Sequence, residues 1–357
     1  MNEHELAILR QFCLDAEPAS CTPYGCGHIN RTYLVATAGG RCYILQKINH
    51  HTFRDVAGLM ENIELVTEHL RRKSPDPRSV LTLIRTKDGK SYLEADDGYW
   101  RVFRFVEDSI CLQQPESDAD FYESAVGFGT FQQLLSDFPA EKLHETIPNF
   151  HNTPDRYRAF HETLTRDPMH RAAQVQPEIE FALARQAEMA ALQTALTAGE
   201  LPLRVTHNDT KLNNVLLDAK TRRALCVIDL DTVMPGSSLY DFGDSIRFGA
   251  ATAAEDERDL AKMEMSLERF RVFTRGYVRS CPGLTQKELE LLPLGAKTMT
   301  MECGVRFLTD YLDGDHYFTV HREGQNLDRA RTQFKLVADM EKKWNDMQKI
   351  VAEEKEN

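Results

Sequence analysis

The chain has 357 residues, of which 42% are hydrophobic, and a formal net charge of -12 at pH 7. This length and composition suit two domains or one large two-lobed fold, and they exclude a disordered chain. The negative charge argues against binding to nucleic acid or to an anionic membrane, because these polyanions would repel the protein. A small, neutral substrate fits this charge better.

The N-terminal segment lacks the features of a signal peptide, because it carries acidic residues and only a short apolar run. No stretch approaches the roughly 20 apolar residues that span a bilayer. The eight cysteines contain no C-x-x-C pair, so neither a zinc site nor a disulfide framework is indicated. We therefore expect a cytoplasmic protein.

Short β-type runs dominate the chain from about residue 20 to residue 107. Gly39 and Gly40 separate the first two runs and supply the positive φ angles that a tight hairpin needs. The predicted strands are residues 32–37, 42–48, 80–85, 91–94 and 100–106. Residues 54–73 instead repeat apolar side chains at helical spacing. This part is predicted to be a small sheet that carries one helix.

The pattern becomes mostly helical after about residue 108. Residues 118–135 repeat apolar side chains at helical spacing behind Ser117 or Asp118 as a cap. One β-like insertion, residues 215–231, is predicted to be a hairpin. The predicted fold class is α+β, with a small β-rich N-terminal lobe in residues 1–107 and a larger, mainly helical lobe in residues 108–357.

The most informative motif is HNDTKLNN, residues 207–214, which has the H-x-D-x-x-x-x-N spacing of a kinase catalytic loop. Phosphoryl transfer needs a carboxylate that orients the attacking hydroxyl and accepts its proton, and oxygen ligands that hold Mg²⁺ against the phosphates. Asp209 fits the first role and Asn214 the second. Taken alone, the motif is also compatible with a capped turn that carries a solvated aspartate.

A second metal ligand is expected directly after the hairpin, where Asp229 and Asp231 alternate with apolar residues. Carboxylates are hard oxygen donors of the kind that magnesium binds. By spacing we assign Asp229 to the metal, while Asp231 either reaches the substrate or stabilises the loop. A catalytic-loop motif and an acid pair in this order rarely arise by chance.

A glycine-containing segment, residues 24–30, lies between two predicted strands without completing a G-x-G-x-x-G motif. Its glycines would let backbone N–H groups approach phosphate oxygens, and an ordinary hairpin turn is the alternative. The cofactor-binding candidates here are Gly25, Gly27, His28 and Asn30. No Walker A sequence occurs, which argues against a P-loop enzyme.

A protein kinase would also carry a lysine on its third strand, paired with a glutamate on the following helix. Strand parity places Lys47 on the same face as the neighbouring apolar side chains and Gln46 on the other face. Parity alone does not decide which of the two faces the nucleotide. The following helix offers Glu61, Glu64 and Glu68 as partners, or simply as solvated charges.

These features together resemble the aminoglycoside phosphotransferase and choline kinase group, which has a protein-kinase-like fold and acts on small molecules. Four segments spread over nearly the whole chain are similar to bacterial N-acetylhexosamine 1-kinases: PYGCGHINRTYLV, LRVTHNDTKLNNVLLD, VIDLDTVMPGSSLYDFGDSIRFGA and MECGVRFLTDYLDGDHYF. The resemblance implies ATP and Mg²⁺ as cosubstrate and metal. It also implies phosphorylation of the anomeric C1 hydroxyl of N-acetylglucosamine or N-acetylgalactosamine, in carbohydrate salvage.

The resemblance also implies roles for individual residues. Asp209 is the expected base, Asn214 and Asp229 are the expected metal ligands, and the hinge at Phe105 and Val106 is expected to meet adenine through its backbone. The sugar site would comprise His28, Asp209, Phe248, Arg306 and Tyr317. We expect a monomer or weak dimer whose partners are a sugar and a nucleotide, with no nucleic acid and no membrane.

Two alternatives concern single segments. Glu302, Arg306 and Asp310 form a stripe at i, i+4 spacing, which would also suit a solvated ladder of ion pairs. Asp241 and Phe242 begin a DFG triplet that follows the acid pair, so we expect them to pack the lobe and not to bind metal.

Two further alternatives concern the whole chain. A choline, homoserine or aminoglycoside kinase would share the scaffold, because the fold does not define the acceptor. A catalytically inactive, nucleotide-binding protein is the alternative from another functional class.

Overall fold

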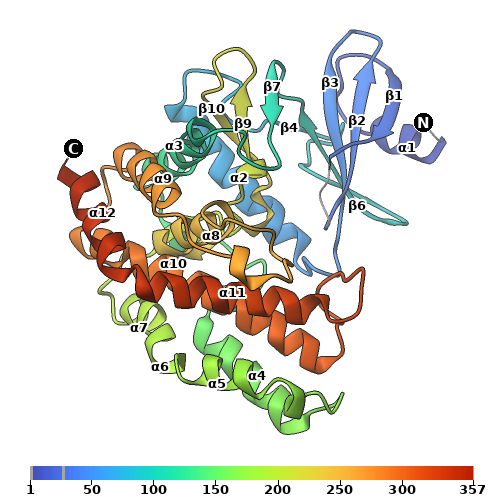
Figure 1. Cartoon of the computed structure of the whole chain (residues 1–357). Coiled ribbons are helices and arrows are strands. Elements are labelled where there is room, and N and C mark those ends of the chain that lie inside the picture. The colour runs from blue at the N-terminus through green and yellow to red at the C-terminus, as the bar shows by residue number, and fades with distance from the viewer. Residues whose placement is uncertain (1–2, 26–28, 357) are drawn as a thin grey trace.

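The computed structural model describes residues 3–25 and 29–356. An antiparallel sheet and two helices come first in the chain, and a larger set of helices follows (Figure 1). Figure 1 shows β1, β2 and β3 together at one end of the molecule, and α4 to α7 at the other. This arrangement confirms the mixed architecture that the sequence predicts.

The first sheet has the strand order β1-β2-β3-β6-β4, with β5 also paired to β6, in the described part of the chain. All of these pairs are antiparallel. The strands are β1 Pro18–Pro23, β2 Arg31–Thr37, β3 Cys42–Ile48, β4 Leu83–Ile84, β5 Leu93–Ala95 and β6 Gly98–Arg104. The predicted strands are confirmed, although the run at 80–85 contributes only two residues. Gly40, with φ +85°, provides the predicted turn between β2 and β3.

Two helices accompany this sheet, α1 Glu3–Leu9 and α2 Val56–Lys73, so the prediction of one helix is wrong. Helix α1 was missed because its seven residues are too few to show a clear helical period. The side chain of Asp55 caps α2 by accepting the Gly58 N–H. Buried Asn62 on α2 donates to the carbonyl oxygens of His144 (2.8 Å) and Val233 (3.0 Å). One hydrophobic cluster contains α2 side chains together with residues of 131–143 and 205–233. The core therefore continues past residue 107, and a domain boundary there stays a prediction.

The longer helices form the rest of the molecule. They are α3 Asp118–Leu134, α4 Thr153–Arg166, α5 Gln176–Leu183, α6 Gln186–Met189, α7 Ala191–Thr197, α8 Ser238–Gly249, α9 Leu267–Ser280, α10 Gln286–Asp313, α11 Gln325–Lys342 and α12 Trp344–Glu356. Helices α3, α8, α9 and α10 pack around one cluster that includes Phe242 and Phe273. Helices α8 and α10 approach closely at Gly243, where a Cβ would lie 2.4 Å from the Gly295 carbonyl oxygen.

Two small sheets flank the predicted catalytic loop. Strand β9 (Val215–Asp218) pairs with β10 (Ala224–Val227), which confirms the predicted hairpin, and with β7 (Ser109–Cys111). Strand β8 (Arg204–Thr206) pairs with β11 (Met234–Gly236). Strands β7, β8 and β11 have three residues each and are too short to show a sequence period. Because β8 ends and β9 begins at its two ends, the loop at 207–214 is held between these sheets.

Across the residues that the structure describes, no helix combines the length and the apolar character needed to cross a membrane.

Candidate active site

The loop at 207–214 is anchored to helix α8 through its backbone. The buried carboxylate of Asp241 accepts the N–H groups of His207 (2.9 Å) and Asn208 (2.8 Å), and it also accepts Gln132 Nε2 (2.7 Å). Asn208 has a left-handed backbone with φ +65°. Such a conformation costs energy and needs support from its surroundings. The Asp241 contacts supply that support directly before Asp209.

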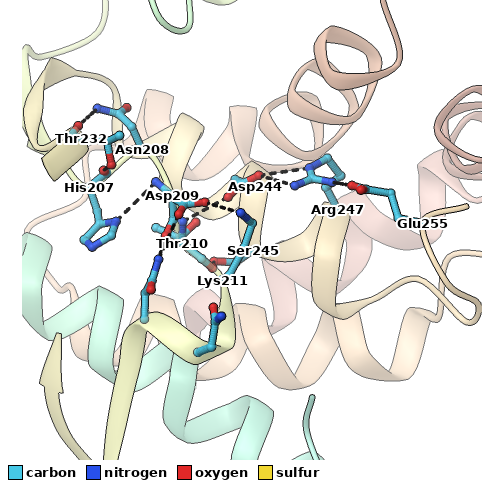
Figure 2. A network of polar contacts seen from close by, with 12 residues as sticks. His207, Asn208, Asp209, Thr210, Lys211, Thr232, Asp244, Ser245, Arg247 and Glu255 are labelled. Atoms are coloured by element: carbon cyan, nitrogen blue, oxygen red, sulfur yellow. Dashed lines mark hydrogen bonds and ion pairs between the residues drawn. The ribbon is translucent and has the colours of Figure 1, made fainter. Parts of the chain in front are cut away.

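Asp241 is buried in the lobe, as expected, and in addition it holds the backbone of the loop. Its neighbour Phe242 is fully buried among aromatic side chains, as expected, but the carboxylate fixes the loop. One turn later, Asp244 accepts the Thr210 N–H at 3.0 Å (Figure 2). The sequence signal was the presence of two acids on one helical face, which could have indicated a polar partner for the loop.

His207 joins the loop to the acid turn, residues 228–231. Its Nδ1 accepts the Asp209 N–H at 3.3 Å, and its Nε2 donates to the Ile228 carbonyl oxygen at 2.8 Å. One ring nitrogen is thus an acceptor and the other a donor, so the imidazole is neutral and carries its proton on Nε2. The Ile228 N–H donates to the Asn214 carbonyl oxygen at 2.9 Å. The acid turn therefore lies against both ends of the loop.

The carboxylate of Asp209 is partly exposed and has one cationic partner and one neutral polar partner. Lys211 Nζ lies 2.8 Å from Oδ1 (Figure 2), and Asn214 Nδ2 donates to Oδ2 at 3.1 Å. The negative charge of Asp209 raises the pKa of Lys211 to about 12, so this lysine stays protonated. These contacts fix the orientation of the Asp209 carboxylate while its side chain stays partly exposed.

Asn214 is nearly buried, with 6% of its surface exposed. Its Nδ2 donates both to the Asp209 carbonyl oxygen (2.8 Å) and to the Asp209 carboxylate. With the amide nitrogen used in this way, the side-chain oxygen is directed elsewhere and can act as a ligand. This geometry fits an amide oxygen donor to a hard cation.

Asp229 begins the short helical turn η4 (Leu230–Thr232) with a left-handed backbone, φ +59°. The residue is exposed, yet the protein surrounding its carboxylate raises the pKa to about 7, and the negative charges of Asp231 and Asp209 add to the rise. Crowding of three carboxylates is unfavourable in the absence of a cation. The donor set therefore fits a divalent cation.

The same set is too small to enclose a metal. Among the described residues, no group of three or more histidine, cysteine, aspartate or glutamate side chains is placed to hold a metal ion. Magnesium usually binds through one or two protein carboxylates together with phosphates and water. Asp229 and Asn214 match that incomplete kind of site.

Asp231 differs from Asp229 because it is buried and has a protein partner close to each carboxylate oxygen. Its Oδ1 lies 2.6 Å from Arg101 Nη1, and its Oδ2 accepts Asn30 Nδ2 at 2.5 Å. Both partners belong to the first sheet or its adjoining loop. Of the two roles expected for Asp231, this geometry favours stabilising the loop. The hydrogen bond to Asp231 also occupies the side-chain amide of Asn30, a residue that we expected to contact the nucleotide.

The two candidates for the position of the kinase lysine, Lys47 and Gln46, lie on opposite faces of β3. Lys47 pairs with Asp97 at 2.5 Å on one face, whereas Gln46 accepts Arg101 Nε at 3.0 Å on the other. Arg101 lies on β6 directly opposite Gln46 and is 1% exposed. The α2 glutamates pair elsewhere, Glu61 with His144, Glu64 with Arg85 and Glu68 with Arg72. The sequence did not identify Arg101 because nothing local distinguishes a strand arginine that becomes buried.

Arg306 lies on α10 among aromatic rings. Its guanidinium is 5.5 Å from the ring centre of Phe150, 5.6 Å from that of Tyr317 and 5.4 Å from that of Phe318. Its Nη2 donates to the Tyr317 hydroxyl at 3.3 Å, and Tyr317 is 64% exposed. Two predicted sugar-site residues are thus in contact.

The alternative of a solvated ion-pair ladder around Arg306 is wrong. Glu302 is 1% and Asp310 is 6% exposed, and neither forms a hydrogen-bonded pair with Arg306. Asp310 accepts the backbone N–H groups of residues 316, 317 and 318. It therefore fixes the segment that presents Tyr317.

Phe248 lies in the last turn of α8 and is partly buried. It follows Asp244 by four residues, so both side chains lie on the same face of the helix. Asp244 holds the Thr210 N–H and pairs with Arg247, which also contacts Glu255 (Figure 2). Phe248 is therefore placed on the side of α8 that faces the loop.

The glycine-containing segment is only partly described. Gly25 has φ +78°, which favours glycine, whereas Gly27 and His28 lie outside the described residues. Tyr24 is 44% exposed and meets the ring of Phe105 edge-on, with centroids 6.1 Å apart. The Phe105 N–H already donates to the Cys42 carbonyl oxygen at 3.1 Å.

Comparison with known proteins gives the family. A family model described as "APH: Phosphotransferase enzyme family" matches residues 20–273. The chain belongs to this family.

Solved structures with the same fold include several small-molecule kinases. A microcompartment-associated aminopropanol kinase has a TM-score of 0.60 and 16% identity, covering 96% of this chain and 98% of its own. Amicoumacin kinase in complex with AMP-PNP and Ca²⁺ has a TM-score of 0.59 and 13% identity, covering 96% and 94%. Choline kinase from Cryptosporidium parvum Iowa II has a TM-score of 0.56 and 13% identity, covering 98% and 97%. At these identities the likeness concerns the fold.

Proposed function

We propose that this phosphotransferase is a two-lobed kinase that uses ATP and Mg²⁺ to phosphorylate the anomeric C1 hydroxyl of N-acetylglucosamine or N-acetylgalactosamine. The observation that carries the proposal is the convergence of Asp209, Asn214 and Asp229. His207 and the Ile228 backbone join the segments that hold these three side chains. The amicoumacin kinase complex supports a nucleotide and a divalent cation in this fold.

In the proposed reaction, Asp209 accepts the proton of the C1 hydroxyl and orients its oxygen towards the γ-phosphate. Lys211 holds the carboxylate in place and remains a cation. Asn214 Oδ1 and Asp229 would bind Mg²⁺, which neutralises charge on the phosphates when it is bound. In this proposal the protein contributes position and charge, because phosphoryl transfer needs little covalent help.

The nucleotide would meet the segment at 105–106. Because the Phe105 N–H is used by Cys42, adenine would contact the Phe105 carbonyl oxygen and the Val106 N–H. The exposed side chains of Tyr24 and Ile29, at the two ends of the glycine-containing segment, would cover the bound nucleotide. Apolar surface of this kind, left uncovered by the protein, commonly marks a ligand site.

The positive charge of Arg306 supports a neutral sugar as the acceptor. Phe150, Tyr317 and Phe318 would suit a quaternary ammonium group, but the Arg306 guanidinium already lies against them. A cationic acceptor would therefore meet a fixed positive charge. Arg306 N–H groups and the exposed Tyr317 ring instead suit a neutral, hydroxyl-rich sugar, whose oxygens accept hydrogen bonds. This observation favours a sugar over choline or an amino alcohol.

A substrate panel tests the proposal. ADP release would be measured with N-acetylglucosamine, N-acetylgalactosamine, choline, aminopropanol, homoserine and an aminoglycoside. We expect turnover on the N-acetylhexosamines and an acid-labile product, which marks a 1-phosphate. The matched control is the methyl glycoside of each sugar, which lacks the reacting hydroxyl and should give no product. Turnover restricted to amino alcohols would contradict the acceptor class, and no turnover on any compound would favour an inactive nucleotide-binding protein.

A further inference from the structure

A buried histidine connects the acceptor side of the site to the peptide before Asp209. His151 is 8% exposed and lies between helix α10 and the loop. Its Nδ1 is 2.8 Å from Glu302 Oε1, and its Nε2 is 3.2 Å from the Asn208 carbonyl oxygen. Glu302 lies one helical turn before Arg306. One imidazole therefore spans the distance between the Arg306 helix and the left-handed residue that precedes the base.

The hydrogen bonds define the charge of this imidazole. A carbonyl oxygen only accepts, so Nε2 must carry a proton. The Glu302 carboxylate also accepts, since Thr153 Oγ1 already donates to its other oxygen at 2.6 Å. Burial would raise the pKa of Glu302, but its hydrogen bonds with His151 and Thr153 and the nearby charge of Arg306 lower the pKa below its ordinary value, so the carboxylate is an acceptor. With two acceptors as partners, His151 carries both ring protons, in contrast to His207, which has one acceptor and one donor.

The pair of His151 and Glu302 contacts the peptide bond directly before Asp209, so it can affect the reaction. The Asn208 carbonyl belongs to the peptide bond whose nitrogen is the Asp209 N–H, which in turn donates to His207. Asp241 holds the other side of Asn208, at its N–H. Losing the His151 contact would release one of the two groups that hold this peptide. Displacements of about 1 Å at a reacting group can cost roughly 100-fold in rate.

We propose that His151 is a positioning residue, a buried imidazolium neutralised by Glu302, that fixes the Asn208 carbonyl and thereby the orientation of Asp209. The Glu302 carboxylate ties this contact to the helix that bears Arg306. Other charged groups near the pair are Arg156 on α4 and Asp244 on α8. The kinetic part of this proposal rests on the proposed kinase function, whereas the charge state of His151 does not.

The charge state is tested first, on the full chain, by nitrogen-15 NMR of the imidazole rings, with His151 assigned by its loss in His151→Asn. We expect both His151 nitrogens to be protonated at pH 7, and Glu302→Gln to convert the ring to a neutral form with a single N–H. A neutral His151 in the unaltered protein would overturn the proposal. This measurement needs no substrate, so it is independent of whether the acceptor is a sugar.

The positioning role is tested by kinetics on three variants. In His151→Gln the amide nitrogen can replace Nε2 as donor to Asn208, whereas His151→Asn is too short to reach it. We expect His151→Asn to lower kcat about 10- to 100-fold with an unchanged KM for the nucleotide, and His151→Gln to restore most of the rate. Thr153→Val, the matched control, removes a hydrogen bond to the same carboxylate without touching Asn208 and should stay within about twofold. Equal losses in all three variants would show that the pair only supports the fold, and would overturn the role.

Discussion

Two short irregular segments form the centre of the site, and they are held in different ways. The loop at 207–214 is fixed to helix α8, through Asp241 and Asp244. The acid turn at 228–231 is fixed to the first sheet, through the ion pair of Asp231 with Arg101. The two segments then meet through His207 and the Ile228 backbone. The site is therefore assembled from two parts of the molecule with separate supports.

Each segment combines one buried acid with one accessible acid. Asp241 and Asp231 are 1% and 3% exposed, and their carboxylates contact donor groups of the protein. Asp209 is partly exposed and Asp229 is exposed, so their carboxylates remain accessible to ligands. The comparison teaches that the acids with predicted chemical roles depend on buried acids that hold the backbone. The four predictions below separate these two kinds of acid.

The largest effect is expected for Asp209→Asn. The substitution keeps the shape and the hydrogen bond from Asn214, but removes the group proposed to accept the proton. We expect kcat to fall about 10²- to 10⁴-fold while nucleotide binding is unchanged. Turnover would be measured alongside calorimetric titration with the nucleotide. Near-normal turnover would remove the assignment of the base.

Asp231→Asn should cost stability instead. It leaves the Arg101 guanidinium buried without its counter-charge, which costs about 3–5 kcal/mol. Denaturant unfolding would measure the loss. The double variant with Arg101→Met removes both charges and should be more stable than Asp231→Asn alone. If Asp231→Asn unfolds like the unaltered protein, the two segments do not have the separate supports described above.

Asp229→Asn should weaken activation by Mg²⁺ without destabilising the fold. We expect the Mg²⁺ concentration for half-maximal activity to rise at least about tenfold, since a charged ligand is lost. The free energy of unfolding without metal should not fall and should rise at pH 7, because the burial and the negative charges that raise the pKa of Asp229 destabilise its charged form. Activity would be titrated with Mg²⁺ at saturating nucleotide. An unchanged Mg²⁺ requirement would exclude Asp229 as a ligand.

Asp97→Asn should have the smallest effect and serves as the control for an acid remote from the site. Partial burial alone would raise the pKa of Asp97, but donors on Lys47, Trp100 and His4 lower it to about 2, below its ordinary value of 3.8. The charged form therefore stabilises the fold above pH 3.8, and this contribution is lost as the pH falls from 3.8 to 2. We expect the variant to be less stable by at most about 1 kcal/mol at pH 7 and equal near pH 2, with unchanged kcat. Thermal unfolding across this pH range would measure the difference in stability between the two proteins. A difference that grew towards low pH would contradict the prediction.

Much of the fold and part of the site could be predicted from the sequence. The spacing within HNDTKLNN and the following hairpin identified Asp209, Asn214 and Asp229 as candidates, because a catalytic loop and its acid pair lie close together in the chain. Strands β2 to β6 and helix α2 followed from apolar periods of two and of about 3.6 residues, whereas α1 was not predicted. Strands β7, β8 and β11 were missed, since three residues show no period.

The sequence determined by itself the longer strands of the first sheet, the helices at 54–73 and 118–135, and the short motif that carries the acids, because these properties depend on neighbours along the chain. Only the tertiary structure decided which charges are buried and with whom: Arg101 with Asp231, and Glu302 with His151. Each of these pairs joins residues more than 100 positions apart, so no local pattern marks them. Their partners are chosen by the packing of sheet against loop and of helix against helix, and that packing is absent from the linear sequence.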